Sequence, residues 1–138
     1  MRRIVPTLLI GVMMSGGLAA CAGNTEELRS EAVGCATYFT VLNEQILSGD
    51  PAFADRVMAA LVDPAATDAD EQLETINRTL IDMAGGTDAW RTEMEAAEIT
   101  ALESEQSALA RRHVAEDRST EAAERISTCV ETWERLNR

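Results

Sequence analysis

The stretch LRSEAVGCATYFTVLNEQI, residues 28–46, decides the fold of this chain. Its apolar residues recur at intervals of four, three, four, three and four, which keeps them on one face of an α-helix. They are Leu28, Ala32, Cys35, Phe39, Leu42 and Ile46. A second series recurs at four, three, four and three near the carboxyl terminus: Ala122, Ile126, Cys129, Trp133 and Leu136. The sequence therefore predicts a helix over 25–48 and another at the end of the chain, each with a cysteine on its buried face.

An antiparallel pairing of these two helices brings apolar residues together along their whole overlap. If Cys35 lies opposite Cys129, then Leu28 faces Leu136, because each lies seven residues from its own cysteine. Phe39 then falls beside Ile126 by the same register. We therefore predict a Cys35–Cys129 disulfide that links the first helix to the last. The alternative is two free core cysteines, which behave as small hydrophobic residues.

Glycine, proline and aspartate mark helix ends between these two segments. Asp50 is expected to cap a short helix that has Pro51 at its first position and ends near Val62. Thr67 or Asp68 would cap a third helix. The buried residues expected in the short helix are Phe53, Val57, Met58 and Leu61, and those expected in the third are Leu73, Ile76, Leu80, Ile81 and Met83. Gly85-Gly86 is expected to end the third helix, and Thr87-Asp88 to cap the next.

The segment from Thr87 to Arg138 contains no glycine or proline. A single helix of this length would extend roughly 75 Å, which is long for a domain of this size. We expect a break over 116–120, where Asp117, Ser119 and Thr120 can cap. The part before it should bury Trp90, Met94, Ile99, Leu102 and Leu109.

No part of the sequence shows the sustained alternation of a β-strand. The sequence thus predicts an all-α fold, a small bundle of about four to five helices. The first and last helices are expected to be antiparallel and disulfide-linked. Residues 27–138 would form a single helical domain, which is near the usual size for one core.

The amino terminus has the layout of an export signal. Arg2 and Arg3 precede an apolar run, residues 4–14, that is too short to cross a bilayer core, which takes about 20 helical residues. Small residues follow, as they do before a cleavage point. We interpret the segment as a secretory signal.

The tetrapeptide Leu18-Ala19-Ala20-Cys21 directly after this run resembles the lipobox of bacterial lipoproteins. The resemblance covers residues 1–21 only. It implies cleavage between Ala20 and Cys21, a diacylglycerol thioether on Cys21, a cleaved signal peptide over 1–20 and a lipid-bearing tether over 21–26. An ordinary secretory signal with a chance cysteine is the alternative. An Asp after the lipidated cysteine commonly retains Gram-negative lipoproteins in the inner membrane, and Ala22 here implies the outer membrane, facing the periplasm.

Cysteine usage and charge narrow the class of function. With lipid on Cys21, the two remaining cysteines form an even pair outside the cytosol, where disulfides are favoured. The mature part carries ten basic and twenty-four acidic side chains, a net charge of about −14. Nucleic-acid binding is disfavoured, because phosphate contacts need clustered Lys and Arg. The acid excess is typical of a solvated surface, and it would also suit a cationic partner.

The sequence offers no catalytic, metal-binding or cofactor-binding site. The one histidine, His113, follows Arg111 and Arg112, an unpromising setting for a metal ligand. A haem bundle would need residues such as Met58, Met83, Met94 and His113, whose positions look like ordinary core and surface. With Cys35 and Cys129 paired, no candidate thiolate nucleophile remains.

Three functions remain. The first is a non-catalytic, membrane-anchored envelope lipoprotein that serves as a helical interaction or scaffold module. The second is a binder or inhibitor of a cationic envelope protein such as a peptidoglycan hydrolase. The third, a cofactor-carrying bundle, has the least support. The oligomeric state is open, because a second apolar seam could lie around Ile99, Leu102 and Leu109.

Overall fold

A computed structural model gives the structure of this chain. It describes the backbone of residues 4–138 and the side chains of residues 25–138. The predicted lipidation site Cys21 and the cleavage site Ala20–Cys21 lie outside the residues whose side chains are described. Over residues 25–138, whose side chains are described, the helices lack an apolar stretch that could span a bilayer.

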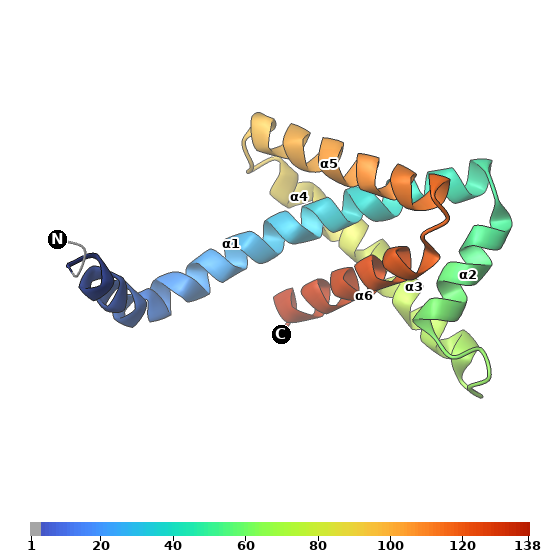
Figure 1. Cartoon of the computed structure of the whole chain (residues 1–138), viewed down its shortest axis with the longest axis horizontal. Coiled ribbons are helices and arrows are strands. Elements are labelled where there is room, and N and C mark those ends of the chain that lie inside the picture. The colour runs from blue at the N-terminus through green and yellow to red at the C-terminus, as the bar shows by residue number, and fades with distance from the viewer. Residues whose placement is uncertain (1–3) are drawn as a thin grey trace.

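The described residues form helices and no strands (Figure 1). The helices are α1 (Ile4–Ser48), α2 (Pro51–Leu61), α3 (Ala69–Gly86), α4 (Asp88–Arg91), α5 (Ala96–Ala115) and α6 (Ser119–Leu136). Since α4 is only four residues long, five longer helices build the bundle. The predicted all-α class is confirmed, and so is the end of the first helix at Ser48.

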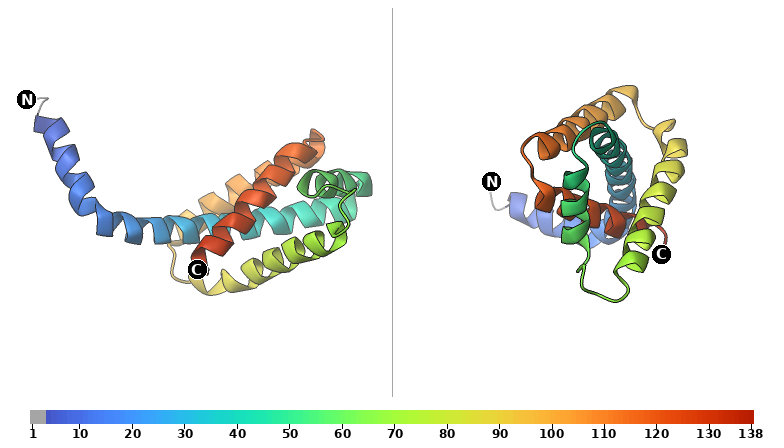
Figure 2. Two further views of the ribbon diagram at one scale, coloured as in Figure 1. Left: turned by 90° about the horizontal axis from the view of Figure 1, so that it is seen from below. Right: turned by 90° about the vertical axis from the view of Figure 1, so that its right-hand side faces the viewer.

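From residue 25 onward, α1 is the central helix of the bundle. Helices α2, α3, α5 and α6 all pack on it, as the end-on view in Figure 2 shows. Helix α6 runs antiparallel to α1 (Figure 1). Because α1 is surrounded, it buries more than the predicted face: Tyr38 and Val41 are in the core together with Cys35 and Leu42. Phe39, placed in the core by the spacing, is only partly buried.

The disulfide between Cys35 and Cys129 joins the first helix to the last. Their Cα atoms are 5.6 Å apart, and the side chains are 0% and 2% exposed. This confirms the predicted pairing of the two cysteines. The register around it also agrees with the prediction, because Phe39 and Ile126 line the same cavity.

The start of α2 and the end of α3 lie where the sequence predicted them. The predicted side-chain cap of α3 by Thr67 or Asp68 is wrong, because Asp68 at the start of that helix makes no capping hydrogen bond. The carboxylate of Asp50 accepts a hydrogen bond from the backbone N–H of Ala52 at 2.9 Å, and Pro51 begins α2. Helix α3 ends at Gly86, which packs closely against α6: a Cβ atom at this position would lie 2.5 Å from the Trp133 ring. The predicted side-chain cap from Thr87 is wrong, because its buried hydroxyl donates to the carbonyl of Ala84 at 3.2 Å.

The helix break predicted over 116–120 is confirmed, but the interactions that form it differ from the predicted side-chain caps. Asp117 has a left-handed backbone with φ of 53°. The N–H of Arg118 donates to the carbonyl of His113 at 2.7 Å, and that of Asp117 donates to Val114 at 3.2 Å. These two bonds form a Schellman motif that closes α5. No side chain caps the start of α6, so the predicted role of Asp117, Ser119 and Thr120 as caps is wrong.

A second break, between α4 and α5, was not predicted. The chain turns after Arg91, and Glu95 is extended with ψ of 140° before α5 begins. The centre of the Trp90 ring lies 5.7 Å from that of the Trp133 ring of α6. Arg91 forms an ion pair with Glu103 of α5 across the bend. Tertiary contacts of these side chains therefore interrupt a sequence that has helical propensity throughout.

Two residues expected in the core are exposed: Met58 is 40% and Ile81 is 56% exposed. Each follows a buried residue, Val57 and Leu80, that occupies the inner face of its helix. Neighbouring helices cover only a narrow stripe of α2 and α3, so the next residue along reaches solvent. The five residues expected to be buried in the segment before residue 116 are only partly buried: Trp90, Met94, Ile99, Leu102 and Leu109.

Candidate functional site

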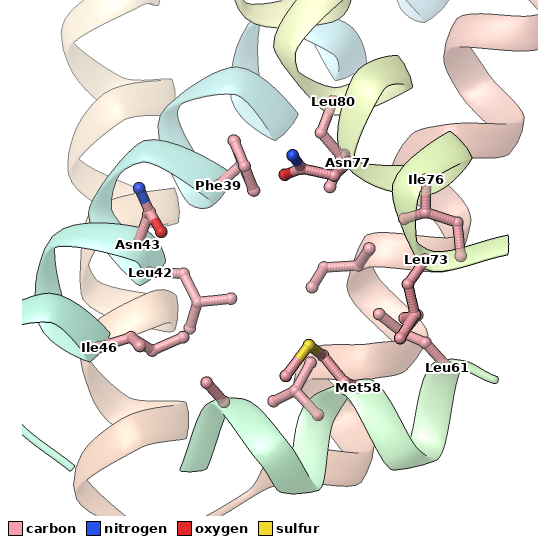
Figure 3. A pocket seen from close by; sticks show the side chains of 13 residues that line it. Phe39, Leu42, Asn43, Ile46, Met58, Leu61, Leu73, Ile76, Asn77 and Leu80 are labelled. Atoms are coloured by element: carbon pink, nitrogen blue, oxygen red, sulfur yellow. The ribbon is translucent and has the colours of Figure 1, made fainter. Parts of the chain in front are cut away.

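An apolar cleft lies between α1, α2 and α3, with Ile126 of α6 also in its lining (Figure 3). Its volume is about 180 Å³, and eleven of its thirteen lining residues are apolar. No charged side chain lines it. Sites of this kind, concave and mostly apolar with a few polar groups, are where proteins bind small molecules.

The helical faces predicted from the sequence supply the walls of this cleft. Helix α1 contributes Phe39, Leu42 and Ile46, the part of its apolar face that follows Cys35. Helix α2 contributes the buried Val57, and Met58 next to it is partly open to solvent. Helix α3 contributes residues at helical spacing: Leu73, Ile76 and Leu80. The three faces meet around a common space without filling it.

Two side-chain amides are the polar groups of the cleft. Asn43 comes from α1 and Asn77 from α3, and both lie at the end where Phe39 and Leu80 are found (Figure 3). Met58 lies at the opposite end. Among residues 25–138, no side chain or backbone group forms a hydrogen bond with either amide. Each amide therefore keeps its donors and its acceptor available.

A buried polar pair joins α1 to α5 elsewhere in the bundle. The hydroxyl of Tyr38 lies 2.7 Å from Nδ1 of His113, and the two rings meet edge to face with centroids 5.7 Å apart. Burial raises the pKa of the Tyr38 phenol and lowers the pKa of the His113 imidazole. The neutral imidazole can accept the hydrogen bond at Nδ1, so both groups are satisfied inside the core.

Arg125 of α6 organises the polar groups next to this pair. Its guanidinium donates to Oε1 of Gln106 at 3.0 and 3.2 Å, forms an ion pair with Glu31 and lies 5.9 Å from the centre of the Tyr38 ring. The arrangement links α1, α5 and α6. No buried side-chain nitrogen or oxygen in the described residues is left without a hydrogen bond. The polar groups of this cluster therefore bond to one another, and the cluster is structural.

The structure brings together no metal-ligand set in the part of the chain whose side chains it describes. No group of three or more His, Cys, Asp and Glu side chains there could hold a metal ion. His113 is hydrogen-bonded to Tyr38. Met83 is fully buried, whereas Met58 lies at the cleft.

A groove between α1 and α5 gathers acidic side chains. It has a volume of about 400 Å³, and its lining includes Leu102 and Arg125. The carboxylates along it belong to Glu26, Glu27, Glu31, Glu98 and Glu105. Glu31 is paired with Arg125, so the remaining carboxylates set the negative charge of this groove.

The cleft was not among the sites predicted from the sequence. The predicted disulfide residues lie in the core, and the predicted lipidation residue Cys21 lies outside the described side chains. Asn43 directly follows Leu42, and Asn77 directly follows Ile76, so a polar residue beside each apolar face was the available signal. No protein-family model, no curated protein and no solved structure matches this chain.

Proposed function

We propose that this chain is a lipid-anchored, non-catalytic protein of the bacterial envelope, and that its helical domain works by binding. The observation that carries the proposal is the Cys35–Cys129 disulfide. It accounts for the two cysteines that remain once Cys21 is assigned to lipid. Disulfides form and persist in compartments such as the periplasm and are rare in the cytosol. The disulfide therefore supports the export that the amino-terminal segment predicts independently.

The lipid on Cys21 would provide the attachment to the membrane. A single acyl chain gives marginal binding, whereas two or more hold a protein stably. The mature chain is strongly acidic, so attraction of basic residues to anionic lipid contributes little. A tether over 21–26 would keep the bundle close to the membrane surface. In a Gram-negative cell, Ala22 favours the outer membrane, with the domain in the periplasm.

The arrangement of polar groups supports binding as the activity. The cleft presents two neutral amides, Asn43 and Asn77, and no titratable side chain. The buried titratable pair, Tyr38 and His113, is engaged within itself. A site of apolar walls and neutral amides can orient a ligand but offers no group for nucleophilic or acid–base chemistry.

Labelling with a fatty acid in a Gram-negative host tests the anchor. The full chain is expected to incorporate the labelled acyl group and to sediment with membranes in high salt. Cys21→Ala should lose the label. The double variant Cys35→Ala/Cys129→Ala is the matched control, because it removes the other cysteines and should keep the label. An unlabelled wild-type chain would refute the proposal.

The acidic groove between α1 and α5 favours a second candidate, a binder or inhibitor of a cationic envelope protein. Glu27 and Glu98 line it from the two helices. Charge complementarity raises association rates, and added salt screens it. A purified basic peptidoglycan hydrolase should bind more weakly as salt increases, and more weakly to Glu27→Gln/Glu98→Gln than to the matched double variant Glu71→Gln/Glu74→Gln on α3. Equal binding by both double variants would rule out this groove as the site.

A further inference from the structure

We propose that the cleft between α1, α2 and α3 binds a small neutral molecule that has an apolar body and one hydrogen-bonding group. A hydroxyl, a carbonyl or an amide would serve as that group. The inference deepens the proposed function, since it rests on the domain acting by binding. It does not depend on the lipid anchor.

The size of the cleft limits the ligand. Its volume is about 180 Å³. An engineered apolar cavity of about 150 Å³ in another protein holds benzene, whereas sites for drug-sized ligands start at about 300 Å³. The cleft therefore suits one ring or a short chain, with roughly six to eight non-hydrogen atoms in the apolar body.

The chemistry of the walls determines the charge of the ligand. No Lys, Arg, Asp, Glu or His lines the cleft, and the floor residues Leu42 and Val57 are 2% and 4% exposed. An ionised group placed against such walls would lose its hydration without gaining a counter-charge. A carboxylate, a phosphate or an ammonium group is therefore excluded by the same surface that favours a neutral molecule.

The two amides define where the polar group of the ligand lies. Asn43 and Asn77 reach the same end of the cleft from different helices (Figure 3). Each amide offers two donors and one acceptor oxygen, and the structure commits none of them to another described residue. A ligand hydroxyl at this end could donate to the oxygen of either amide or accept from its NH₂ group. Its apolar body would then extend toward Met58 and Leu61.

Larger occupants fit the surroundings less well. A second protein chain would need about 800 Å² of contact on each partner. Met58, at 40% exposed, is the one large apolar residue of the cleft that is widely open to solvent. The acyl chains on Cys21 would be remote, because α1 rises about 25 Å between Thr25 and Leu42. The size and access of the cleft thus point to a small molecule.

Titration of the mature full-length protein with 1-hexanol, followed by NMR, tests the proposal. The expected result is saturable shifts of the Leu42, Val57 and Ile126 methyl groups and of both asparagine side-chain amides. Hexanoate at neutral pH should bind at least about tenfold more weakly, because its carboxylate has no partner. Saturable binding of hexanoate with equal affinity would overturn the proposed ligand class.

Variants distinguish binding in the cleft from non-specific binding to apolar surface. Ala54→Leu adds volume to the wall and should abolish hexanol binding, whereas Leu47→Ala, at a 79% exposed position outside the cleft, should leave it unchanged. Asn43→Leu/Asn77→Leu should weaken hexanol about five- to tenfold and leave toluene binding intact. An intact disulfide and unchanged helical circular dichroism show that each variant is folded.

Three results would overturn the inference. They are the absence of saturable shifts up to the solubility of hexanol, shifts confined to residues outside the cleft, and concentration-dependent shifts of the cleft residues without ligand, which would indicate a second copy. Fatty-acid labelling of Cys21 is independent of all three. A labelled protein that binds no hexanol would contradict the ligand proposal and support the lipid anchor. An unlabelled protein that binds hexanol would support the ligand proposal and contradict the lipid anchor.

Discussion

The hydroxyl of Tyr38 lies 2.7 Å from Nδ1 of His113, which joins two residues 75 positions apart in the sequence. The side chains are 0% and 6% exposed, so the contact is inside the bundle, between α1 and α5. The single histidine of the chain is thus part of the structural core. We therefore expect the stability of the fold to depend on pH.

The free energy of unfolding should fall when the pH is lowered below about 6.5. Burial lowers the pKa of His113 below its ordinary value of 6.5, against the smaller opposing effect of Glu121, while Arg112 and Arg118 also lower it. The unfolded chain therefore takes up the proton first as the pH falls. The stability contribution is complete above the unfolded pKa and is lost as the pH falls through the folded pKa.

Urea denaturation of the wild type and of His113→Gln at pH 7.5 and pH 5.5 measures this effect. Titrating carboxylates are common to both proteins, so their contribution cancels in the difference. The wild type should lose more stability than the variant over this interval. Equal losses would show that His113 does not titrate differently in the folded and unfolded states.

Replacing Arg125 with Met should lower the free energy of unfolding by about 2–3 kcal/mol. Its side chain is 14% exposed, and its removal leaves the 7% exposed Gln106 without its donor. The matched control is Arg78→Met, which breaks an ion pair between side chains that are 63% and 72% exposed. Such surface pairs are worth about 0–1 kcal/mol. Similar urea midpoints for both variants would contradict the structural role of Arg125.

Loss of the disulfide should destabilise the bundle strongly. The bridge closes a loop with a sequence separation of 94 residues. In the chain-entropy model this is worth about 4 to 5 kcal/mol, and strain in the folded state reduces it. Cys35→Ala/Cys129→Ala should therefore unfold at much lower urea concentration than the oxidised wild type, and the reduced wild type should behave like the variant. An unchanged midpoint would mean that the bridge does not constrain the unfolded chain.

Two adjacent glycines should respond to alanine in opposite directions. A Cβ at Gly86 would lie 2.5 Å from the Trp133 ring, so Gly86→Ala should cost about 1–3 kcal/mol through overpacking. A Cβ at Gly85 would meet nothing within 4 Å, so Gly85→Ala should stabilise α3 by up to about 1 kcal/mol. Thermal unfolding of the two variants gives the comparison. A gain of stability at both positions would argue against the α3–α6 contact, and a loss for Gly85→Ala would contradict the open space expected there.

The sequence predicted the framework of the fold because local signals agree with the tertiary structure there. Cys35 and Cys129 each lie on a face with helical spacing, and this register made their pairing predictable. Asp50-Pro51 acts within one turn of the chain, through the carboxylate that accepts the N–H of Ala52 and the proline at the first helical position. These signals are local, so they can be recognised in the sequence without knowing how the helices pack.

The remaining features depend on how the helices surround one another. Tyr38 and His113 lie outside any simple apolar stripe, and they became core residues because α1 is covered on several sides. The turn after Arg91 is accompanied by contacts of Trp90 with Trp133 of α6 and of Arg91 with Glu103 of α5. The cleft is the space left where three helices meet, so periodicity along any one of them could not reveal it.

The intact mass of the protein recovered from bacterial membranes, measured with and without reductant, tests the central claim most directly. The account predicts a chain that begins at Cys21, carries acyl groups on that residue and gains two hydrogen atoms on reduction, one for each sulfur of Cys35 and Cys129. An unmodified amino terminus together with thiols that react before reduction would contradict both the lipid anchor and the disulfide.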